Sequence, residues 1–278
     1  MTSPAAERFN RTAEGYLRWW APVLAPASVR LVDRLGRIDP GLPYGEPRDV
    51  LDVGCGTGSS LLEAARRWPG ARLVGLDASV GMLALAGHEA ERLPAGARER
   101  VGFIESDSAS LPFADQSFDL VMTSFMLQLV PSRPPVLAEF RRVLRPGGIV
   151  AIASWLTESE PFAPEVELEA ALSDAGIVRP PRLEARSGHY RSAAAAAREL
   201  QRAGFRGVAP REETLDHTWT REDFAAYRET TRDRDLFESL EPDARKRALL
   251  ALERRLWALT PDQLVYRPPI VSLVGHRP

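Results

Sequence analysis

The chain has 278 residues, of which 44% are hydrophobic, and a formal net charge of −2. A chain of this length buries a sizeable core, so we expect a single domain with inserted cap segments. The charge gives no electrostatic case for nucleic acid or a membrane surface as a partner, and the single cysteine, Cys55, excludes an intramolecular disulfide and a cysteine metal cluster.

Residues 1–37 are predicted to form a helical arm. Charged side chains are spread through its first thirty residues, so it lacks the apolar core of a signal peptide. No apolar run in the sequence approaches the roughly 20 residues of a membrane helix, and we expect a cytoplasmic protein. Prolines and glycines over residues 39–47 predict a loop after the arm.

A strand, a glycine-rich turn and a helix are predicted next. Residues 50–53 are mostly apolar and read as a buried strand. Gly54, Gly56 and Gly58 follow at alternate positions, and apolar residues recur at helical spacing from Leu61. Glycine brings a backbone close to a ligand, and the free N–H groups of a helix start favour negative charge. The stretch therefore predicts a site for a nucleotide-like cofactor.

The second strand, residues 72–76, ends in Asp77, which is well placed to accept hydrogen bonds from both hydroxyls of a ribose. The glycine spacing is G-x-G-x-G, with Asp52 two residues before it, whereas the dinucleotide fingerprint is G-x-G-x-x-G. Both dehydrogenases and methyltransferases carry such a glycine–acid pair, so these residues alone leave both classes open.

Three more strands are predicted over residues 101–104, 117–124 and 149–153. With the segments between them, the chain resembles the class I S-adenosylmethionine-dependent methyltransferases. The matching segments, in the family's order, are Val50-Leu51-Asp52-Val53-Gly54-Cys55-Gly56-Thr57-Gly58, Gly75-Leu76-Asp77, Asp107 with Leu111-Pro112-Phe113, Phe118-Asp119, and Leu144-Arg145-Pro146-Gly147-Gly148. The resemblance implies an α/β fold with a Rossmann-like, seven-stranded, mostly parallel sheet and helices on both faces. It also implies S-adenosylmethionine as cofactor and S-adenosylhomocysteine as product.

The resemblance further implies roles for individual residues around that cofactor. Asp52 orients the amino-acid end, the loop from Gly54 through Cys55 and Gly56 to Gly58 passes under the methionine part, and Asp77 binds the ribose. The remaining cofactor candidates are Ala78 and Met82 against the adenine, Asp107 with Ser108 at its amino group, the carbonyl of Thr123 at the ammonium, and Tyr16 and Trp20 over the methionyl end. Core packing is the alternative for Ala78 and Met82, and docking of the arm is the alternative for the two aromatic residues.

The second half of the chain matches no motif. We expect irregular structure over 156–188 with a short helical segment around 166–175, and helices over 190–203, 221–230 and 242–258. A strand is expected to begin at 205–208, and the last strand is expected over 270–274. The resulting organisation is one methyltransferase domain over 1–278, with the arm at 1–37, the cofactor-binding core at 49–155, cap segments at 156–190 and 220–260, and the final strand within 261–278. The arm and cap segments are predicted to enclose a largely apolar acceptor pocket.

The predicted function is methyl transfer to an oxygen, carbon or nitrogen of a small, partly hydrophobic acceptor, by a monomer or homodimer without a metal. Histidine is the commonest base near neutral pH, and the catalytic candidates are His189, Tyr190 beside it, and His217. Two alternatives stay open. One is a nicotinamide-dependent oxidoreductase, whose Tyr/Lys version is disfavoured by Lys246 being the sole lysine. The other is a module that binds the cofactor or a partner without catalysis.

Overall fold

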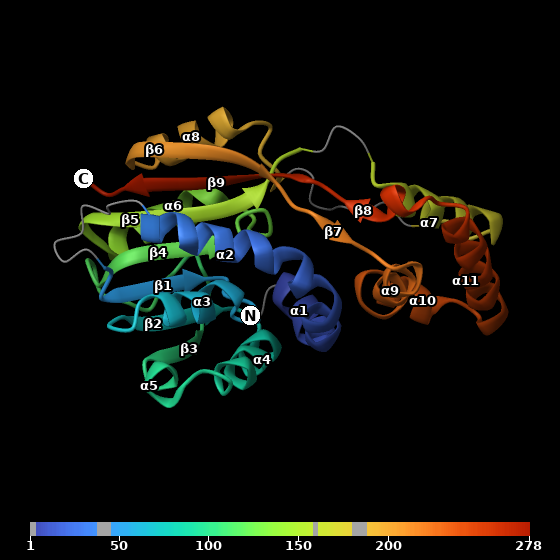
Figure 1. The fold of residues 1–278 in the computed structure, drawn as a ribbon, viewed down its shortest axis with the longest axis horizontal. Helices are drawn as coiled ribbons and strands as arrows, with labels where there is room; N and C mark the ends of the chain where they lie inside the picture. Colours follow the sequence, from blue (N-terminus) through green and yellow to red (C-terminus); the bar gives the residue numbers. More distant parts are fainter. Residues whose placement is uncertain (1–3, 38–45, 158–160, 180–187) are drawn as a thin grey trace.

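The computed structural model describes residues 4–37, 46–157, 161–179 and 188–278. Within them, a seven-stranded sheet has the order β3-β2-β1-β4-β5-β9-β6 (Figure 1). Its strands are β1 (Asp49–Val53), β2 (Arg72–Asp77), β3 (Val101–Glu105), β4 (Phe118–Ser124), β5 (Leu144–Trp155), β6 (Arg206–Thr214) and β9 (Pro269–His276). Strands β1 to β5 pair in parallel, and β9 runs antiparallel to β5 and β6. The predicted mostly parallel, Rossmann-like sheet is confirmed.

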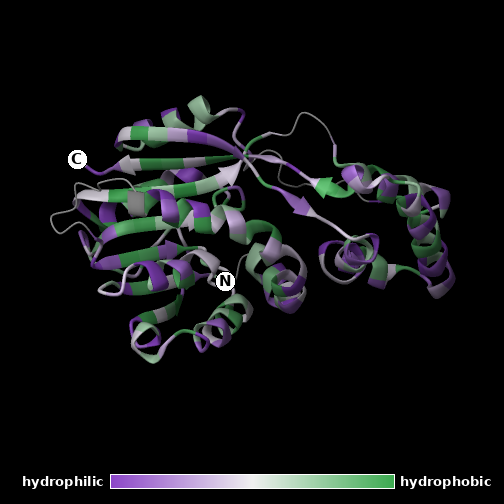
Figure 2. Cartoon of the chain, viewed as in Figure 1, coloured by the Kyte–Doolittle hydropathy of each residue, from purple (hydrophilic) through white to green (hydrophobic). Residues whose placement is uncertain are grey.

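Helices cover both faces of the sheet because alternate strand residues point to opposite sides. Val50 of β1 joins a buried cluster with α2 (Ala21–Arg37) and α3 (Ser59–Arg67). Its neighbour Leu51 joins a second cluster with α6 (Arg133–Val143) and α8 (Ala193–Arg202). Figure 2 shows the central strands as mostly hydrophobic, as expected for parallel strands buried on both faces.

The N-terminal arm is helical throughout its described part, residues 4–37. Helix α1 (Pro4–Gly15) leads into a π-helical turn, η1 (Tyr16–Trp20), and then into α2. Helix α2 lies along the sheet, whereas α1 lies beyond the sheet's edge beside α4 (Val80–Ala90) (Figure 1). Short helix α5 (Ala95–Arg98), which the apolar pattern did not predict, follows α4.

Helices from two separate parts of the chain form a lobe beside the sheet, which we call the cap lobe (Figure 1). It consists of α7 (Ala163–Asp174), α9 (Arg221–Tyr227), the π-helical turn η3 (Arg228–Arg232), α10 (Arg234–Ser239) and α11 (Pro242–Trp257). Arg255 of α11 bridges Glu167 and Asp174 of α7 at 2.9 and 2.8 Å. The small sheet of β7 (His217–Thr218) and β8 (Val265–Tyr266) connects this lobe to the main sheet, and η4 (Pro261–Leu264) precedes β8.

Several boundaries differ from the sequence-based expectation. Strand β6 continues to Thr214 because its backbone pairs with β9 as far as Thr214↔Pro269. Most of its side chains are exposed, so no apolar pattern marks this edge. The helix expected over 221–230 becomes π-helical after Tyr227, and α10 was not predicted. Parts of the expected loop at 39–47 and of the cap segment at 156–190 lie outside the described residues. No helix among the described residues is long and apolar enough to cross a membrane.

Candidate functional site

The glycine loop lies between β1 and α3. Gly54, Gly56 and Gly58 all have positive φ, at 69°, 54° and 88°, a region in which glycine is unstrained. The N–H of Gly54 donates to the carbonyl of Leu76 at 2.7 Å, which ties the loop to β2. A Cβ added to Gly54 would lie 2.3 Å from Cγ of Met126, whereas one added to Gly56 would meet nothing within 4 Å. Packing thus requires glycine at the first position, and open space lies beside the second.

Asp77, at the end of β2, holds the glycine loop through its side chain. Oδ2 accepts the N–H of Gly56 and Oδ1 accepts the N–H of Ser79, both at 2.9 Å. Burial raises the pKa of Asp77, and the backbone N–H groups of Ser79, Gly56 and Ala78 oppose that shift. Each carboxylate oxygen has a second lone pair for a ligand. The acid and the glycine turn that the sequence paired are therefore in direct contact.

Asp52 lies on β1, just before the loop, and is 1% exposed. Neither of its carboxylate oxygens has a side-chain partner among the described residues, and the backbone N–H of Leu61 is the one group that favours its ionised form. Burial, followed by the nearby charge of Asp77, raises the pKa of Asp52 to about 8. A buried carboxyl group without a partner destabilises the fold, so its presence is typical of a place where a ligand supplies the missing donor.

The arm brings two of its predicted residues toward this region. Burial is the main cause that raises the pKa of the Tyr16 hydroxyl, and the charges of Asp77 and Tyr227 add to it. Tyr16 is therefore within electrostatic range of both the β2 acid and the cap lobe. Trp20 stacks on Tyr227 with ring centroids 5.3 Å apart and planes 2° apart. The arm thus lies near the β2 acid and packs on the cap lobe.

The remaining cofactor candidates have different surroundings. Ala78 and Ser108 are half-buried, and Asp107 is exposed, with Oδ1 accepting the N–H of Ala109 at 2.8 Å. Met82 is only 2% exposed, so protein atoms already enclose it. Thr123 is fully buried in β4, and its Oγ1 has no partner among the described residues. Cys55 is buried, which raises the pKa of its thiol, with the charges of Asp52 and Asp77 adding to the effect.

Aromatic rings gather beyond the carboxyl ends of β4 and β5. Phe125 directly follows β4 with φ 55°, a left-handed conformation that is costly for a bulky residue. Its N–H donates to the carbonyl of Ala153 at 2.8 Å, and its ring centroid lies 4.7 Å from that of Trp155. Trp155 is also 6.3 Å from Trp20 and 6.4 Å from Tyr266. Sequence reasoning missed Tyr266, since no spacing relates β8 to the ends of these strands.

The three catalytic candidates lie in three different places. The ring of His189 stacks on Trp155 at 6.1 Å, beside the strand ends. His217 lies in β7, with its ring 4.8 Å from Trp219, and burial lowers its pKa against an opposing effect of Asp223. This places it in the connection to the cap lobe.

Tyr190 belongs to the buried cluster of α6 and α8, on the face of the sheet opposite to α3. Its hydroxyl donates to Glu199 Oε1 at 3.2 Å, and the guanidinium of Arg133 lies 4.3 Å from its ring centroid. Burial, with a contribution from Glu199, raises its pKa. These contacts engage the hydroxyl of Tyr190 with Glu199 and its ring with Arg133.

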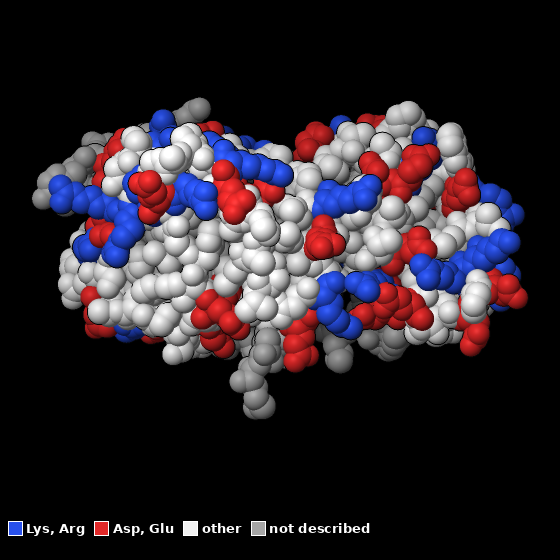
Figure 3. Space-filling view, turned by 90° about the horizontal axis from the view of Figure 1, so that it is seen from below, with Lys and Arg blue, Asp and Glu red and all other residues white. Residues whose placement is uncertain are grey.

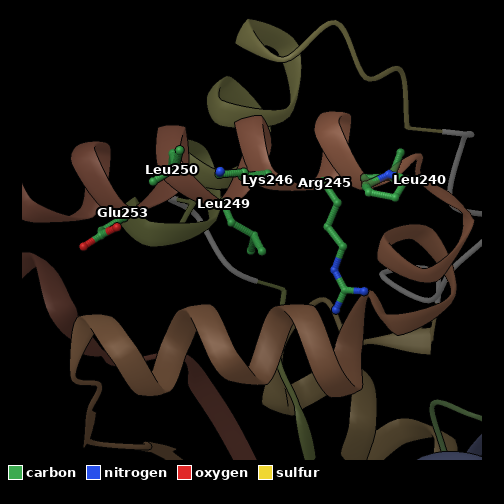
Figure 4. A pocket seen from close by; sticks show the side chains of 7 residues that line it. Leu240, Arg245, Lys246, Leu249, Leu250 and Glu253 are labelled. Carbon is green, nitrogen blue, oxygen red and sulfur yellow. The ribbon is translucent and has the colours of Figure 1, made fainter.

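A separate groove lies on the cap lobe along α11, with Leu240 at one end (Figure 4). Leu240, Lys246, Leu249 and Leu250 line it, and Arg245 extends from it to pair with Glu229 at 2.7 Å. None of its lining residues is a cofactor candidate. Among the described residues, no group of three or more His, Cys, Asp or Glu side chains is arranged to hold a metal ion.

Comparison with known proteins identifies the family. Residues 50–148 match the family model described as a methyltransferase domain. The nocamycin O-methyltransferase of Saccharothrix syringae is 31% identical over 262 residues, and the alignment covers 90% of each chain. The chain belongs to the class I S-adenosylmethionine-dependent methyltransferases. The predicted family and its cofactor are confirmed, and the nicotinamide-dependent alternative is not favoured.

Other methyltransferases are similar over less of their length. The malonyl-[acyl-carrier protein] O-methyltransferase of Xylella fastidiosa is 34% identical over 134 residues, and the chain spans only 41% of it. Among solved structures, the YcgJ protein of Bacillus subtilis superposes with a TM-score of 0.57 at 16% identity, covering 91% of this chain and 98% of that one. At 16% identity, the similarity to the YcgJ protein supports the fold alone.

Proposed function

We propose that this methyltransferase transfers the methyl group of S-adenosylmethionine to an oxygen atom of a small, partly hydrophobic acceptor. The observation that carries the proposal is the contact between Asp77 and Gly56, near the buried carboxyl group of Asp52, which has no side-chain partner among the described residues. The choice of oxygen is supported by the relative aligned over 90% of both chains, which is named as an O-methyltransferase.

The residues of the loop fit the chemistry of the cofactor. Asp52 offers a buried carboxyl group with no side-chain partner among the described residues, which, once ionised, suits an ammonium group or a bridging water. Asp77 keeps lone pairs for a ribose diol, and the open space at Gly56 leaves room beside the backbone. The other proposed contacts are the carbonyl of Thr123 for the ammonium, Tyr16 and Trp20 for the methionyl end, Ala78 and Met82 for the adenine, Asp107 and Ser108 for its amino group, and Gly54, Cys55 and Gly58 for the loop itself.

When bound, S-adenosylmethionine supplies an electrophilic methyl group on a positively charged sulfur. The protein's own task is to orient the acceptor and to exclude water, which together lower the barrier by several kcal/mol, on the order of 7 to 11 for good orientation. The rings of Trp20, Trp155 and Tyr266 surround the strand ends and provide apolar walls. Aromatic faces also favour a nearby cation.

An oxygen acceptor has to lose its proton, and we propose His189 as the base that accepts it. Of the three candidates, His189 alone stacks on the aromatic wall at the ends of β4 and β5. Its half-buried ring remains within reach of solvent, to which the proton is passed. A positioned base of this kind contributes about 10²- to 10⁴-fold in rate.

We further propose that the protein works in the cytoplasm, as a monomer or homodimer, on a small-molecule acceptor and not on nucleic acid. The net charge of −2 supports this. On the face shown in Figure 3, basic and acidic side chains alternate without a field of one sign. Such a surface does not attract a polyanion.

Calorimetry with S-adenosylmethionine, S-adenosylhomocysteine and NAD tests the cofactor, and a tritium-labelled methyl group tests the transfer. We expect both sulfur compounds to bind and NAD not to bind. We also expect label to move to hydroxylated, partly apolar compounds from a panel that includes amine and carbon acceptors. Binding of NAD without S-adenosylhomocysteine, or label entering only amines or carbon, would overturn the assignment.

A further inference from the structure

The side chain of Asn10, in α1, lies on the turn that follows Asp77. Its Oδ1 accepts the hydroxyl of Ser79 at 2.7 Å and the N–H of Gly81 at 3.0 Å. A backbone N–H is only a donor, so the amide must present its oxygen there, which fixes its orientation. A residue of the arm thus accepts two hydrogen bonds from the segment that carries the β2 acid.

The same turn holds the carboxylate of Asp77. Ser79 is fully buried, its N–H donates to Asp77 Oδ1 at 2.9 Å, and its Oγ caps α4 by accepting the N–H of Met82 at 3.2 Å. Asp77 in turn accepts the N–H of Gly56. A continuous series of hydrogen bonds therefore runs from Asn10 through Ser79 and Asp77 to the glycine loop.

Helix α1 approaches its neighbours closely on two sides. At Gly81 of α4, an added Cβ would lie 3.2 Å from the backbone of Asn10. At Gly15, an added Cβ would lie 2.1 Å from Oγ1 of Thr231 in the cap lobe. Arg11 also pairs with Asp235 of α10 at 3.1 Å. Figure 1 shows α1 between α4 and the α9–α10 end of the cap lobe.

We propose that Asn10 is a positioning residue for Asp77, and that α1 couples occupancy of the cofactor site to the order of η3 and α10 in the cap lobe. The inference rests on the proposed function, because it assigns Asp77 to the cofactor. Asn10 itself contacts no substrate; it acts by fixing the turn.

The coupling has a direct physical basis. Without Oδ1 of Asn10, the Ser79 hydroxyl and the Gly81 N–H lose their acceptor, and the turn gains conformations that binding must then remove. Coupling between two sites is reciprocal. A cofactor that orders the turn therefore also orders α1 and whatever α1 contacts through Gly15 and Arg11.

Calorimetric titration with S-adenosylhomocysteine tests the positioning role. We expect Asn10→Ala to bind it about 5- to 30-fold more weakly, the effect of losing one or two hydrogen bonds. Thr12→Ala is the matched control, because Thr12 lies on the same helix and its hydroxyl donates to the carbonyl of Arg8; we expect it to bind like the wild type. Because Asn10 and Ser79 act in series, Asn10→Ala combined with Ser79→Ala should lose less affinity than the two single losses multiplied.

Hydrogen exchange of residues 228–239, with and without saturating S-adenosylhomocysteine, tests the coupling. We expect the compound to slow exchange there in the wild type and in Thr12→Ala, and to leave it unchanged in Asn10→Ala. Gly15→Ala, which forces a methyl group against Thr231, should also lose the effect while keeping the calorimetric affinity within about threefold. Equal behaviour of Asn10→Ala and Thr12→Ala in both measurements would overturn the inference. A wild type that does not bind S-adenosylhomocysteine would instead overturn the proposed function.

Discussion

The indole of Trp20 and the phenol ring of Tyr227 lie face to face, with centroids 5.3 Å apart and planes 2° apart. One ring comes from the N-terminal arm and the other from the cap lobe, and Trp219 stacks on the far side of Tyr227 at 5.2 Å. Two segments that are distant in sequence thus meet in a single aromatic stack beside the strand ends. This stack is where the arm and the cap lobe are held together.

Trp20→Ala should therefore remove the main aromatic link between arm and cap lobe. We expect a loss of about 2 to 4 kcal/mol in the free energy of unfolding, as for other large-to-small core changes. We also expect a larger rise in acceptor KM than in the Kd of S-adenosylhomocysteine, with Trp20→Phe retaining most of both. Chemical denaturation and steady-state kinetics measure these quantities. Unchanged acceptor kinetics in Trp20→Ala would remove Trp20 from the acceptor wall.

Tyr190→Phe tests the assignment of Tyr190 to a structural position. The substitution removes the hydroxyl that donates to Glu199 and keeps the ring under Arg133. We expect a loss of about 1 kcal/mol of stability and turnover within about twofold of the wild type. His189→Gln, at the strand ends, should lower kcat by about 10²-fold or more with little change in cofactor affinity. A reversed order of the two kcat effects would restore Tyr190 as the catalytic candidate.

Substitutions at Gly54 and Gly56 should affect different properties, the first mainly stability and the second mainly cofactor binding. Gly54→Ala places a Cβ 2.3 Å from Met126, and we expect it to cost about 2 kcal/mol or more of stability. Gly56→Ala meets no protein atom within 4 Å, so its cost is only the strain of a positive φ, about 1 kcal/mol. Its methyl group enters the space proposed for the cofactor, and we expect at least about tenfold weaker S-adenosylhomocysteine binding. Normal binding by Gly56→Ala would place the cofactor elsewhere.

Asp52 should give the free protein a distinctive pH dependence. Its pKa in the fold is about 8, above its ordinary value of 3.8. Between these values the unfolded chain is ionised at this residue and the folded chain is protonated, so its contribution to stability falls as the pH rises through that window. Asp52→Asn should remove this slope and stabilise the free protein near pH 7.5 by about 1 to 2 kcal/mol. Urea denaturation at several pH values measures it.

The same residue predicts proton release on binding. If Asp52 pairs with the cofactor's ammonium group, it must ionise, so affinity for S-adenosylhomocysteine should rise with pH below its free pKa of about 8 and level off above it. Calorimetry in two buffers of different ionisation enthalpy counts the protons released. Asp52→Asn should bind more weakly and lose the pH dependence, and a pH-independent wild type would contradict the role.

The cofactor half of the fold was predictable because its signals are local. The spacing of Gly54, Gly56 and Gly58 predicts a turn with positive φ. Parallel pairing of β1 with β2 then brings the side chain of Asp77 to the N–H of Gly56. Tyr190 instead lies beside the end of β5 through a bridge to Leu156, and its hydroxyl meets Glu199 of α8. No pattern within the sequence determines that choice.

The sequence predicted helices in the cap lobe, but not how these helices pack on one another. The packing of α7 on α11 joins residues such as Asp174 and Arg255, which are 81 positions apart. The role of Asn10 could not be predicted either, because an asparagine within a helical arm is usually a surface residue. Only the fold shows that its side chain accepts hydrogen bonds from Ser79 and Gly81. Contacts between distant segments, and not local propensity, define these parts of the site.

Lys246 supplies the sole side-chain amine of the sequence, and it stands on α11 at the groove of the cap lobe (Figure 4). All other basic side chains of the Lys and Arg class are arginines, which do not react with amine-selective reagents. Apart from the α-amino group, a fluorophore ester or an acylating probe therefore marks one side chain, far along the chain from the glycine loop; labelling at about pH 9 and mapping the product separate the two amines. The natural sequence thus carries its own attachment point for a spectroscopic reporter of the cap lobe, without any engineered cysteine.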